Sequence, residues 1–327
     1  MPKFEPQSWQ PQKAPALVGT YAENSTLAAA QLWETGGLGP EDVAVAANGE
    51  VFTGLSDGSI IRFSLDGHGP EKVADAGGRP LGIELLGDGE LLVCNADLGL
   101  QRVTTSGEVT VLADRFGDQV LKFTNNAAVA SDGTIYFTDT STRWGIHEYV
   151  NDLVEGQATG RVFARRRDGS LEVIVDGLQF ANGLALDGTE ASLFIAETGR
   201  HRIHRHWLKG DRAGTTDIFV DNLPGFPDNL SFSDGILWTA APSPRQAILD
   251  LMSPRPWLRH VTHRLPASLK PKPVRHAIVL GFDNAGSVIH NLQDSTGRVA
   301  ITTSASCHDG RLFIGTLTEP TLAVYEL

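Results

Sequence analysis

A six-fold repeat is the feature of this sequence that most restricts its fold. Each copy has a turn, with glycine or alanine as its second residue, followed by a short apolar segment with strand character. The second turn residues are Gly49, Gly89, Gly133, Ala191, Gly235 and Gly310. Successive copies lie 40, 44, 58, 44 and 75 residues apart. A period of about 40–45 residues is typical of a four-stranded propeller blade. The repeat therefore predicts an all-β, six-bladed β-propeller, lengthened by two insertions.

The two ends of the chain are expected to share one blade. The last copy lies so close to the C-terminus that residues 321–327 supply only one further strand, so the segment before Glu41 has to provide the missing one. Closing the ring in this way leaves no open sheet edge. We expect residues 1–327 to form a single propeller domain, because all-β domains often reach this length.

Two insertions interrupt the repeat. The first lies between Asp139 and Gly160, and the second lies between Ala240 and Arg275. The second has apolar residues at helical spacing, broken by two prolines, so we expect a short helical insertion of two helices near residues 246–269. Long excursions from a compact repeat are often functional. We expect this one to form a lid or specificity wall over one mouth of the propeller, or else a packing brace.

Polar residues recur at one position of the repeat, seven to nine residues before each turn residue. This position begins the strand expected to be innermost in its blade, so its residues should form a ring around the axis. The six residues are Glu41, Leu81, Asn125, Asn182, Asp228 and Thr302. Taken singly, each polar residue is also consistent with a turn or a solvated side chain. Together, two carboxylates and two carboxamides are typical oxygen ligands of a hard cation, and the lack of histidine and cysteine argues against zinc. We expect Glu41, Asn125, Asn182 and Asp228 to bind Ca²⁺ or another divalent cation.

The composition argues against several classes of partner. The formal net charge of −12 argues against nucleic acid, which binds basic surfaces. No stretch of the sequence has the apolar length of a signal peptide or a membrane span, so we expect a cytoplasmic protein with no membrane partner. Cys94 and Cys307 are too far apart in sequence for a paired metal or redox motif. The expected partner is a small-molecule substrate, and the sequence gives no indication of the oligomeric state.

Five long segments, which together span most of the chain, carry a family resemblance. They are residues 39–63, 78–103, 176–187, 202–229 and 308–317. They resemble the strictosidine synthase-like branch of the calcium-dependent six-bladed propellers, a superfamily that also includes gluconolactonase/regucalcin, paraoxonase and diisopropyl fluorophosphatase. The resemblance implies that Asn229 occupies a position that some members use for calcium. It also implies that the ligands of the catalytic calcium are Glu41, Asn125, Asn182 and Asp228.

Three departures from this family pattern narrow what the resemblance implies. Asn126 stands where relatives often have aspartate, which weakens the case for a second, structural calcium. Leu81 stands where paraoxonase-like members have a catalytic histidine, so a histidine dyad is not expected. Residues 299–308 include no acidic side chain, whereas true strictosidine synthases use a late glutamate, so alkaloid condensation is not expected.

The ring and the resemblance together predict a metal-dependent hydrolase of a lactone or another ester. The metal would polarise the carbonyl and stabilise the developing oxyanion, with Asp228 as general base or nucleophile. Further substrate contacts are expected from aromatic and histidine side chains of the two insertions, for each of which a surface or packing role is the alternative. The expected substrate-binding residues are Asn125, Asn182, Trp144, His147 and Trp257.

Two alternatives to hydrolysis stay open at this point. One is a non-catalytic propeller that binds a small ligand or a protein partner on the same face, because propellers serve both as enzymes and as scaffolds. The other is non-hydrolytic, strictosidine synthase-like chemistry at the same metal.

Overall fold

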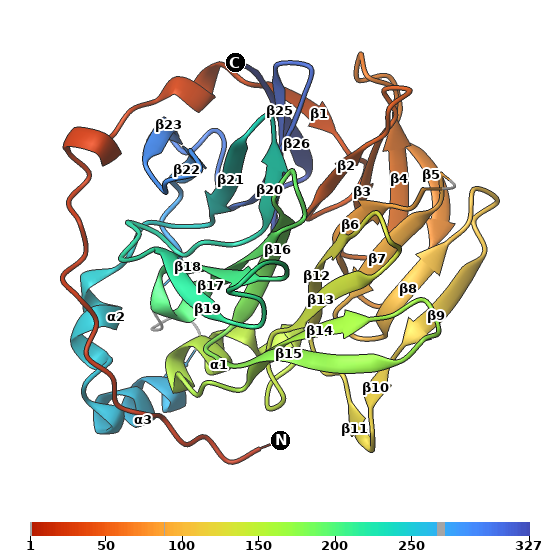
Figure 1. The fold of residues 1–327 in the computed structure, drawn as a ribbon. Helices are drawn as coiled ribbons and strands as arrows, with labels where there is room; N and C mark the ends of the chain where they lie inside the picture. Colours follow the sequence, from red (N-terminus) through yellow and green to blue (C-terminus); the bar gives the residue numbers. More distant parts are fainter. Residues whose placement is uncertain (1, 88, 267–271) are drawn as a thin grey trace.

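Short apolar strands and tight turns build six four-stranded antiparallel sheets, which are arranged around one axis (Figure 1). The architecture is that of a computed structural model, which describes residues 2–87, 89–266 and 272–327. Apart from a small hairpin of β10 (Arg115–Phe116) and β11 (Gln119–Val120), every strand within these ranges belongs to one of the six sheets. The predicted six-bladed β-propeller is confirmed.

The blades follow the order of the chain, each running from its inner to its outer strand. Blades 1 to 3 contain β2 (Val43–Val45), β3 (Val51–Gly54), β4 (Ser59–Phe63), β5 (Glu71–Asp75), β6 (Pro80–Leu85), β7 (Leu91–Asn95), β8 (Gly99–Val103), β9 (Val109–Ala113), β12 (Thr124–Val129), β13 (Ile135–Asp139), β14 (Gly160–Arg165) and β15 (Leu171–Leu178). Blades 4 and 5 contain β16 (Ala181–Leu186), β17 (Ser192–Glu197), β18 (Arg202–Trp207), β19 (Thr216–Val220), β20 (Leu230–Ser233), β21 (Ile236–Ala241), β22 (Ala277–Phe282) and β23 (Val288–Asp294). Blade 6 contains β24 (Thr302–His308), β25 (Arg311–Thr316), β26 (Thr321–Glu326) and β1 (Gln31–Glu34).

The turn residues of the repeat explain why each inner strand reverses into the next. Gly49 and Gly235 have φ angles of 87° and 77°, a region that glycine adopts without steric cost. In blade 4, where the sequence has alanine at this position, the preceding Glu190 takes the positive φ angle of 53°. This blade therefore forms its hairpin with a non-glycine residue, Glu190, in a left-handed conformation that is uncommon outside glycine.

Strand β1 closes the ring, as expected for the segment before Glu41. It pairs with the C-terminal strand β26, with Trp33 opposite Leu322. The buried indole of Trp33 packs against Phe63 of blade 1 and Phe313 of blade 6, at ring-centroid distances of 5.5 and 5.8 Å. The closing strand therefore contributes to the apolar core between the first and the last blade.

The two insertions form a helical layer beside the propeller (Figure 1). The first contains α1 (Tyr149–Glu155), a helix that the sequence did not predict. The second contains α2 (Ala247–Met252) and α3 (Pro256–Arg264), which confirms the predicted pair of short helices. The end of the predicted insertion, residues 267–269, lies outside the described residues. Helix α3 contacts both α1 and α2, and we call α2 and α3 the helical cap.

The N-terminal segment runs along the helical cap before it reaches β1 (Figure 1). Phe4 stacks on His263 of α3 with a centroid distance of 4.1 Å. The buried Arg259 of α3 donates hydrogen bonds to the carbonyl groups of Gln7 in this segment, of Val154 and Glu155 in α1, and of Ser253 after α2. One guanidinium group therefore joins the N-terminal segment to all three helices.

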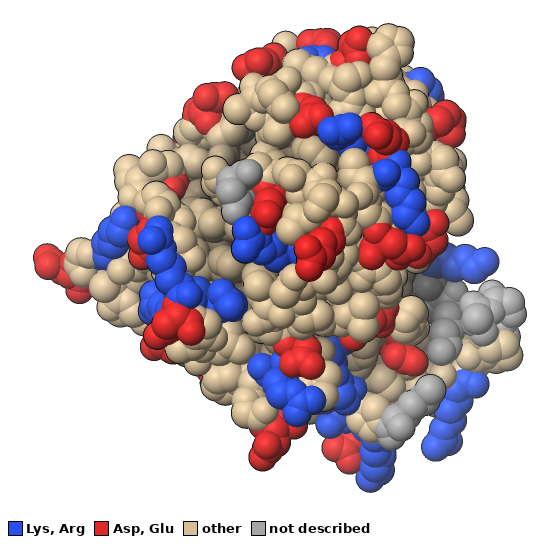
Figure 2. Space-filling model, turned by 90° about the vertical axis from the view of Figure 1, so that its right-hand side faces the viewer, with Lys and Arg blue, Asp and Glu red and all other residues tan. Residues whose placement is uncertain are grey.

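Figure 2 shows the side of the molecule that lies at the right of Figure 1, where acidic and basic side chains are interspersed. Arg62, on the outer part of blade 1, binds both Glu50 and Glu71, at 2.7 and 2.6 Å. Exposed pairs of this kind contribute little stability. They leave no separate basic face on this side of the molecule.

Removal of the closing tryptophan should destabilise the whole propeller. We expect Trp33→Ala to lower the free energy of unfolding by about 3 kcal/mol or more, because it leaves a cavity in the core between blades 1 and 6. Urea unfolding followed by circular dichroism would measure this. The matched control is Trp257→Ala at a side chain that is 64% exposed, which should change stability by about 0.5 kcal/mol or less. Equal effects of the two substitutions would contradict the prediction.

Candidate metal centre and ligand pocket

A shared irregularity at the start of four inner strands shapes the centre of the propeller. In β6, β12, β16 and β24 the pairing register with the next strand skips one residue near the entrance of the strand. A β-bulge of this kind re-aims side chains that would otherwise alternate. In β12, Asn125 lines a pocket at the axis, while the next residue, Asn126, donates a hydrogen bond across the channel to Asp42 of blade 1, at 3.0 Å. Consecutive polar residues thus both face the interior of the ring.

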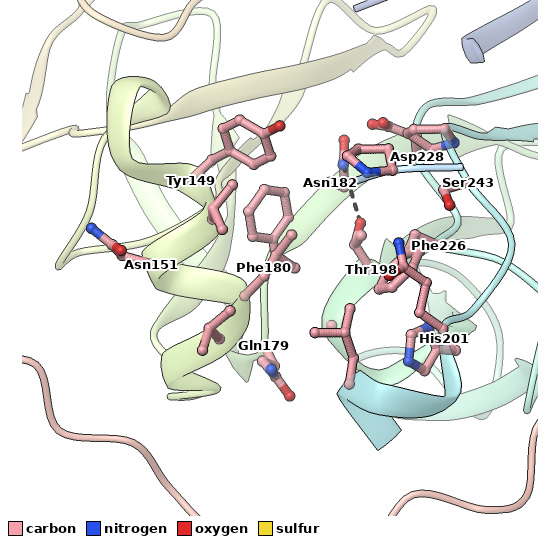
Figure 3. Close-up of a pocket in the computed structure, with 18 of the residues that line it drawn as sticks. Tyr149, Asn151, Gln179, Phe180, Asn182, Thr198, His201, Phe226, Asp228 and Ser243 are labelled. Atoms are coloured by element: carbon pink, nitrogen blue, oxygen red, sulfur yellow. Dashed lines mark hydrogen bonds between the residues drawn. The ribbon is translucent and has the colours of Figure 1, made fainter. Parts of the chain in front are cut away.

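The four predicted metal ligands come together at one end of this channel. They lie at the floor of a single pocket although they come from four different blades. Each side chain is buried, with exposed fractions between 2 and 8%. Figure 3 shows Asn182 and Asp228 next to each other at this floor. The four residues are Glu41, Asn125, Asn182 and Asp228.

Two threonines fix the direction in which the carboxamide groups point. The hydroxyl groups of Thr140 and Thr198 donate to the backbone carbonyls of Ala181 and Pro227, at 2.7 and 2.6 Å. With its only proton used in this way, each hydroxyl can only accept a hydrogen bond from an amide group. It accepts one from the neighbouring asparagine, at 3.0 Å for Asn125 and 3.1 Å for Asn182; Figure 3 shows the bond between Asn182 and Thr198. Each amide NH₂ group is therefore directed at its threonine, and the amide oxygens of Asn125 and Asn182 have no hydrogen-bond partner among the described residues.

Four buried oxygen atoms at this centre have no hydrogen-bond partner among the described residues. They are Glu41 Oε2, Asn125 Oδ1, Asn182 Oδ1 and Asn229 Oδ1. The other carboxylate oxygen of Glu41 accepts a hydrogen bond from the amide of Asn229, at 3.0 Å. A buried acceptor without a partner costs free energy, so a cluster of them indicates a missing positive partner.

The donor set fits a hard divalent cation. All of its atoms are oxygens, and two carboxylates can neutralise a doubly charged ion. No cluster of three or more His, Cys, Asp and Glu side chains in the described parts of the chain could hold a metal. The asparagine oxygens are thus essential to this set, which distinguishes it from a zinc or other transition-metal site.

The carboxylates at the floor are in an unfavourable environment when no cation is present. Burial raises the pKa of Glu41 well above its usual range, and the negative charges of Asp228 and Asp42 raise it further. Burial, with a smaller contribution from Asp42, raises the pKa of Asp228 to about 8. The centre therefore favours protons or a cation over two bare negative charges.

Apolar side chains form the walls above this polar floor. They come from the propeller, from helices α1 and α2 and from the N-terminal segment. Figure 3 shows Tyr149, on α1, and Phe180 at the left of the pocket, with Asp228 and Phe226 across from them at the right. The hydroxyl of Tyr149 is directed toward the side that holds Asp228, and both burial and the charge of Asp228 raise its pKa. The main apolar wall residues are Trp9, Leu81, Phe123, Ile146, Tyr149, Leu153, Phe180, Phe226, Leu249 and Met252.

Three of the expected substrate-binding residues lie away from the pocket walls. The indole of Trp144 is buried and donates a hydrogen bond to Glu155, at 2.8 Å, so it holds the insertion together. His147 is exposed and faces Asp97, at 3.2 Å. Trp257 lies on the outer face of α3 and is 64% exposed. The expectation that these three side chains contact substrate in this pocket is therefore corrected, because their insertions contribute other residues to its walls.

Thr140 and Thr198 are not among the residues predicted from the sequence, although the repeat contains a signal for them. Each follows the acidic residue that ends the second strand of its blade, Asp139 in blade 3 and Glu197 in blade 4. An alignment of second strands, in addition to the turns, would have placed the two threonines at one position. His201, which also lines the pocket, carries no such signal in the repeat.

The geometry defines a class of protein: a six-bladed propeller with an oxygen-lined, cation-competent centre beneath an apolar pocket. The family model for strictosidine synthase matches residues 125–211, and the model for the N-terminal part of strictosidine synthase-like proteins matches residues 19–63. Adipocyte plasma membrane-associated protein from Salmo salar is 35% identical over 96% of this chain and 82% of that protein. Strictosidine synthase-like 3 protein from Arabidopsis thaliana is 32% identical over 88% of this chain and 82% of that protein. The chain belongs to the strictosidine synthase-like family.

Solved structures with the same fold are more distant in sequence. A gluconolactonase from Xanthomonas campestris superposes with a TM-score of 0.67 at 19% identity, covering 91% of this chain and 89% of that one. A calcium-binding regucalcin from Agrobacterium tumefaciens superposes with a TM-score of 0.61 at 12% identity, covering 89% and 94%. At these identities the likeness shows the six-bladed fold.

The expectation of a cytoplasmic protein is wrong. Several relatives at 32–35% identity, from fish to human, are named as plasma membrane-associated proteins, and this overturns the inference from the N-terminal sequence. Among the helices that the structure describes, none is both long and apolar enough to cross a bilayer.

Without a cation, removal of one negative charge from the centre should stabilise the protein. In excess chelator at pH 8, we expect Glu41→Gln to raise the unfolding free energy by about 1 kcal/mol, or about 2 °C in melting temperature, because a buried carboxylate beside another is costly. Differential scanning calorimetry would measure the change. The surface control Glu108→Gln should leave the melting temperature unchanged, and a loss of stability in Glu41→Gln under chelator would contradict the prediction.

Proposed function

We propose that this protein is a calcium-dependent hydrolase of a lactone or another ester. The observation that supports this most strongly is the group of buried oxygen atoms of Glu41, Asn125 and Asn182, unpartnered among the described residues, at the floor of an apolar pocket. A propeller that served only as a scaffold would have no need to keep such atoms unpaired, because their burial is costly. Unpaired polar groups of this kind persist mainly where function requires them.

The chain's own residues have distinct roles in this proposal. Glu41, Asn125, Asn182 and Asp228 would hold the cation, with Asn229 as a further oxygen donor. When bound, a calcium ion would polarise the ester carbonyl and offset the negative charge that develops on its oxygen. Thr140 and Thr198 act indirectly, because they keep the carboxamide oxygens turned toward the floor.

Asp228 is the residue to which we assign the proton transfer. Its carboxylate lies at the floor, close enough to Tyr149 for its charge to raise the pKa of that hydroxyl. In the general-base role it would take a proton from the attacking water, and in the alternative role it would attack the carbonyl carbon itself. The apolar walls would bind the non-reacting part of the substrate and exclude bulk water from the floor.

The names of two structural neighbours agree with this proposal. One is a gluconolactonase, and another is a calcium-binding regucalcin. The walls here are mostly apolar, so we expect the substrate of this chain to present an apolar surface to them.

Calcium should stabilise the folded protein, and the stabilisation should depend on the threonine that orients Asn125. At a calcium concentration of about 100 times Kd, we expect a gain of about 2.7 kcal/mol in unfolding free energy. Thr140→Val should reduce the gain, since it frees the carboxamide to turn, whereas Thr140→Ser should retain it. Thermal melting with and without millimolar calcium would measure this. An unchanged melting temperature of the wild-type protein would count against the site.

Substitution of Asp228 should separate turnover from calcium binding. Asp228→Asn keeps an oxygen at the floor but removes the proton acceptor, so we expect hydrolysis to fall by about two to four orders of magnitude while calcium still raises the melting temperature. A panel of lactones, aryl esters and phosphotriesters, each assayed with calcium and with EDTA, provides the activity measurement. Asp211→Asn, at an exposed residue, is the control. Substantial activity in Asp228→Asn would move the chemistry to another residue, and a wild-type protein inactive on the whole panel would favour the scaffold alternative.

A further inference from the structure

The helical cap presents two different faces. Its inner face, with Leu249, Met252 and Thr262, lines the ligand pocket. Its outer face carries large apolar side chains that are exposed to solvent. Their exposed fractions are 47% for Ile248, 53% for Leu251, 64% for Trp257 and 54% for Val261. The spacings of three residues in α2 and four residues in α3 place each pair on one side of its helix.

This concentration of exposed apolar surface is unusual for the molecule. Fourteen large apolar side chains are exposed among the described residues, and four of them fall within residues 248–261. Trp257 also differs from the other five tryptophans, which are all buried or half-buried. Scattered exposed apolar residues need no explanation, but a local group of them marks an interaction site.

The exposed charged residues in and directly after the helical cap are basic, in contrast to the acidic composition of the whole chain. Arg255, Arg264 and Lys272 are exposed and form no ion pair with any described residue. The one acidic residue of the cap, Asp250, is neutralised by Arg245 at 2.9 Å. The whole chain has a formal net charge of −12. An approaching anionic surface would therefore attract the cap and repel the acidic body of the propeller.

The combination of apolar and basic side chains identifies the kind of surface that fits. A short helix with tryptophan and aliphatic residues beside arginine and lysine lies well in the interfacial region of a lipid bilayer. Tryptophan is enriched at that depth because its ring is apolar and its N–H group is polar. Basic residues beside such a helix are attracted to anionic headgroups.

We propose that the outer face of the helical cap docks on an anionic lipid bilayer, with Trp257 and Val261 inserted at the level of the headgroups. The cap is held in a fixed orientation for this contact, since the buried Arg259 joins it to α1 and to the N-terminal segment. The attachment is peripheral and reversible. This inference stands on the outer face alone and does not depend on the proposed hydrolysis.

Vesicle flotation with the full-length protein tests the proposal. We expect the wild-type protein to float with vesicles of phosphatidylserine and phosphatidylcholine, to bind at least about tenfold less to phosphatidylcholine alone, and to be released by 0.5 M salt. The double variant Trp257→Glu, Val261→Glu should bind the anionic vesicles at least about tenfold less. In a second measurement, Trp257→Phe should abolish most of the blue shift in tryptophan fluorescence that vesicles induce in the wild-type protein.

The matched control replaces two apolar residues of similar exposure on the propeller, Val111→Glu and Ile218→Glu, which should leave vesicle binding unchanged. Circular dichroism and thermal melting confirm that each variant is folded. The proposal is overturned if the wild-type protein does not float with anionic vesicles, or if the control variant loses binding as much as the cap variant. Self-association that is lost only in the cap variant, without vesicle binding, would overturn it in favour of a second copy of the chain.

Discussion

The pairing of β1 with β26 is the contact on which the rest of the molecule depends, because it turns a row of six sheets into a ring. Once the ring is closed, blade 6 lies between blade 5 and blade 1, and Thr303 of blade 6 donates to the carbonyl of Glu41, at 2.6 Å. The same closure brings Asn229 of blade 5 within 3.0 Å of the Glu41 carboxylate, although 188 residues separate them in sequence. The centre is thus a product of the topology rather than of any single blade.

The centre is built by one local device repeated in several blades. The residue that ends the second strand accepts a hydrogen bond from the backbone N–H at the entrance of the inner strand, at 3.2 Å for Asn95, 3.0 Å for Asp139 and 2.8 Å for Glu197. This anchors the bulged entrance of each inner strand. The anchored backbone fixes the polar side chains of the strand entrances, including those of Asn125 and Asn182, whose amide oxygens have no partner in the described parts of the chain. Strands outside the closed ring would not keep these side chains in that costly conformation.

The repeat made the blades and the ring of polar residues predictable, since both follow from spacing along the chain. Helix α1 was not predictable in the same way. Its seven residues lack a side-chain cap hydrogen bond at the N-terminus, and a helix this short gains most of its stability from packing, here against α3. The locations of Trp144 and Trp257 were equally hidden, because the path of an insertion depends on tertiary contacts. Their residue types suggested a pocket wall, whereas one became a buried brace and the other an exposed side chain.

The position of Arg259 has a consequence for how the pocket can open. Its guanidinium holds carbonyl groups from the N-terminal segment, from the end of α1 and from the residue after α2. Since all three elements border the pocket, no one of them can swing outward without breaking hydrogen bonds that the others share. An outward movement of any one of these elements therefore has either to break its hydrogen bonds to Arg259 or to carry the other elements with it.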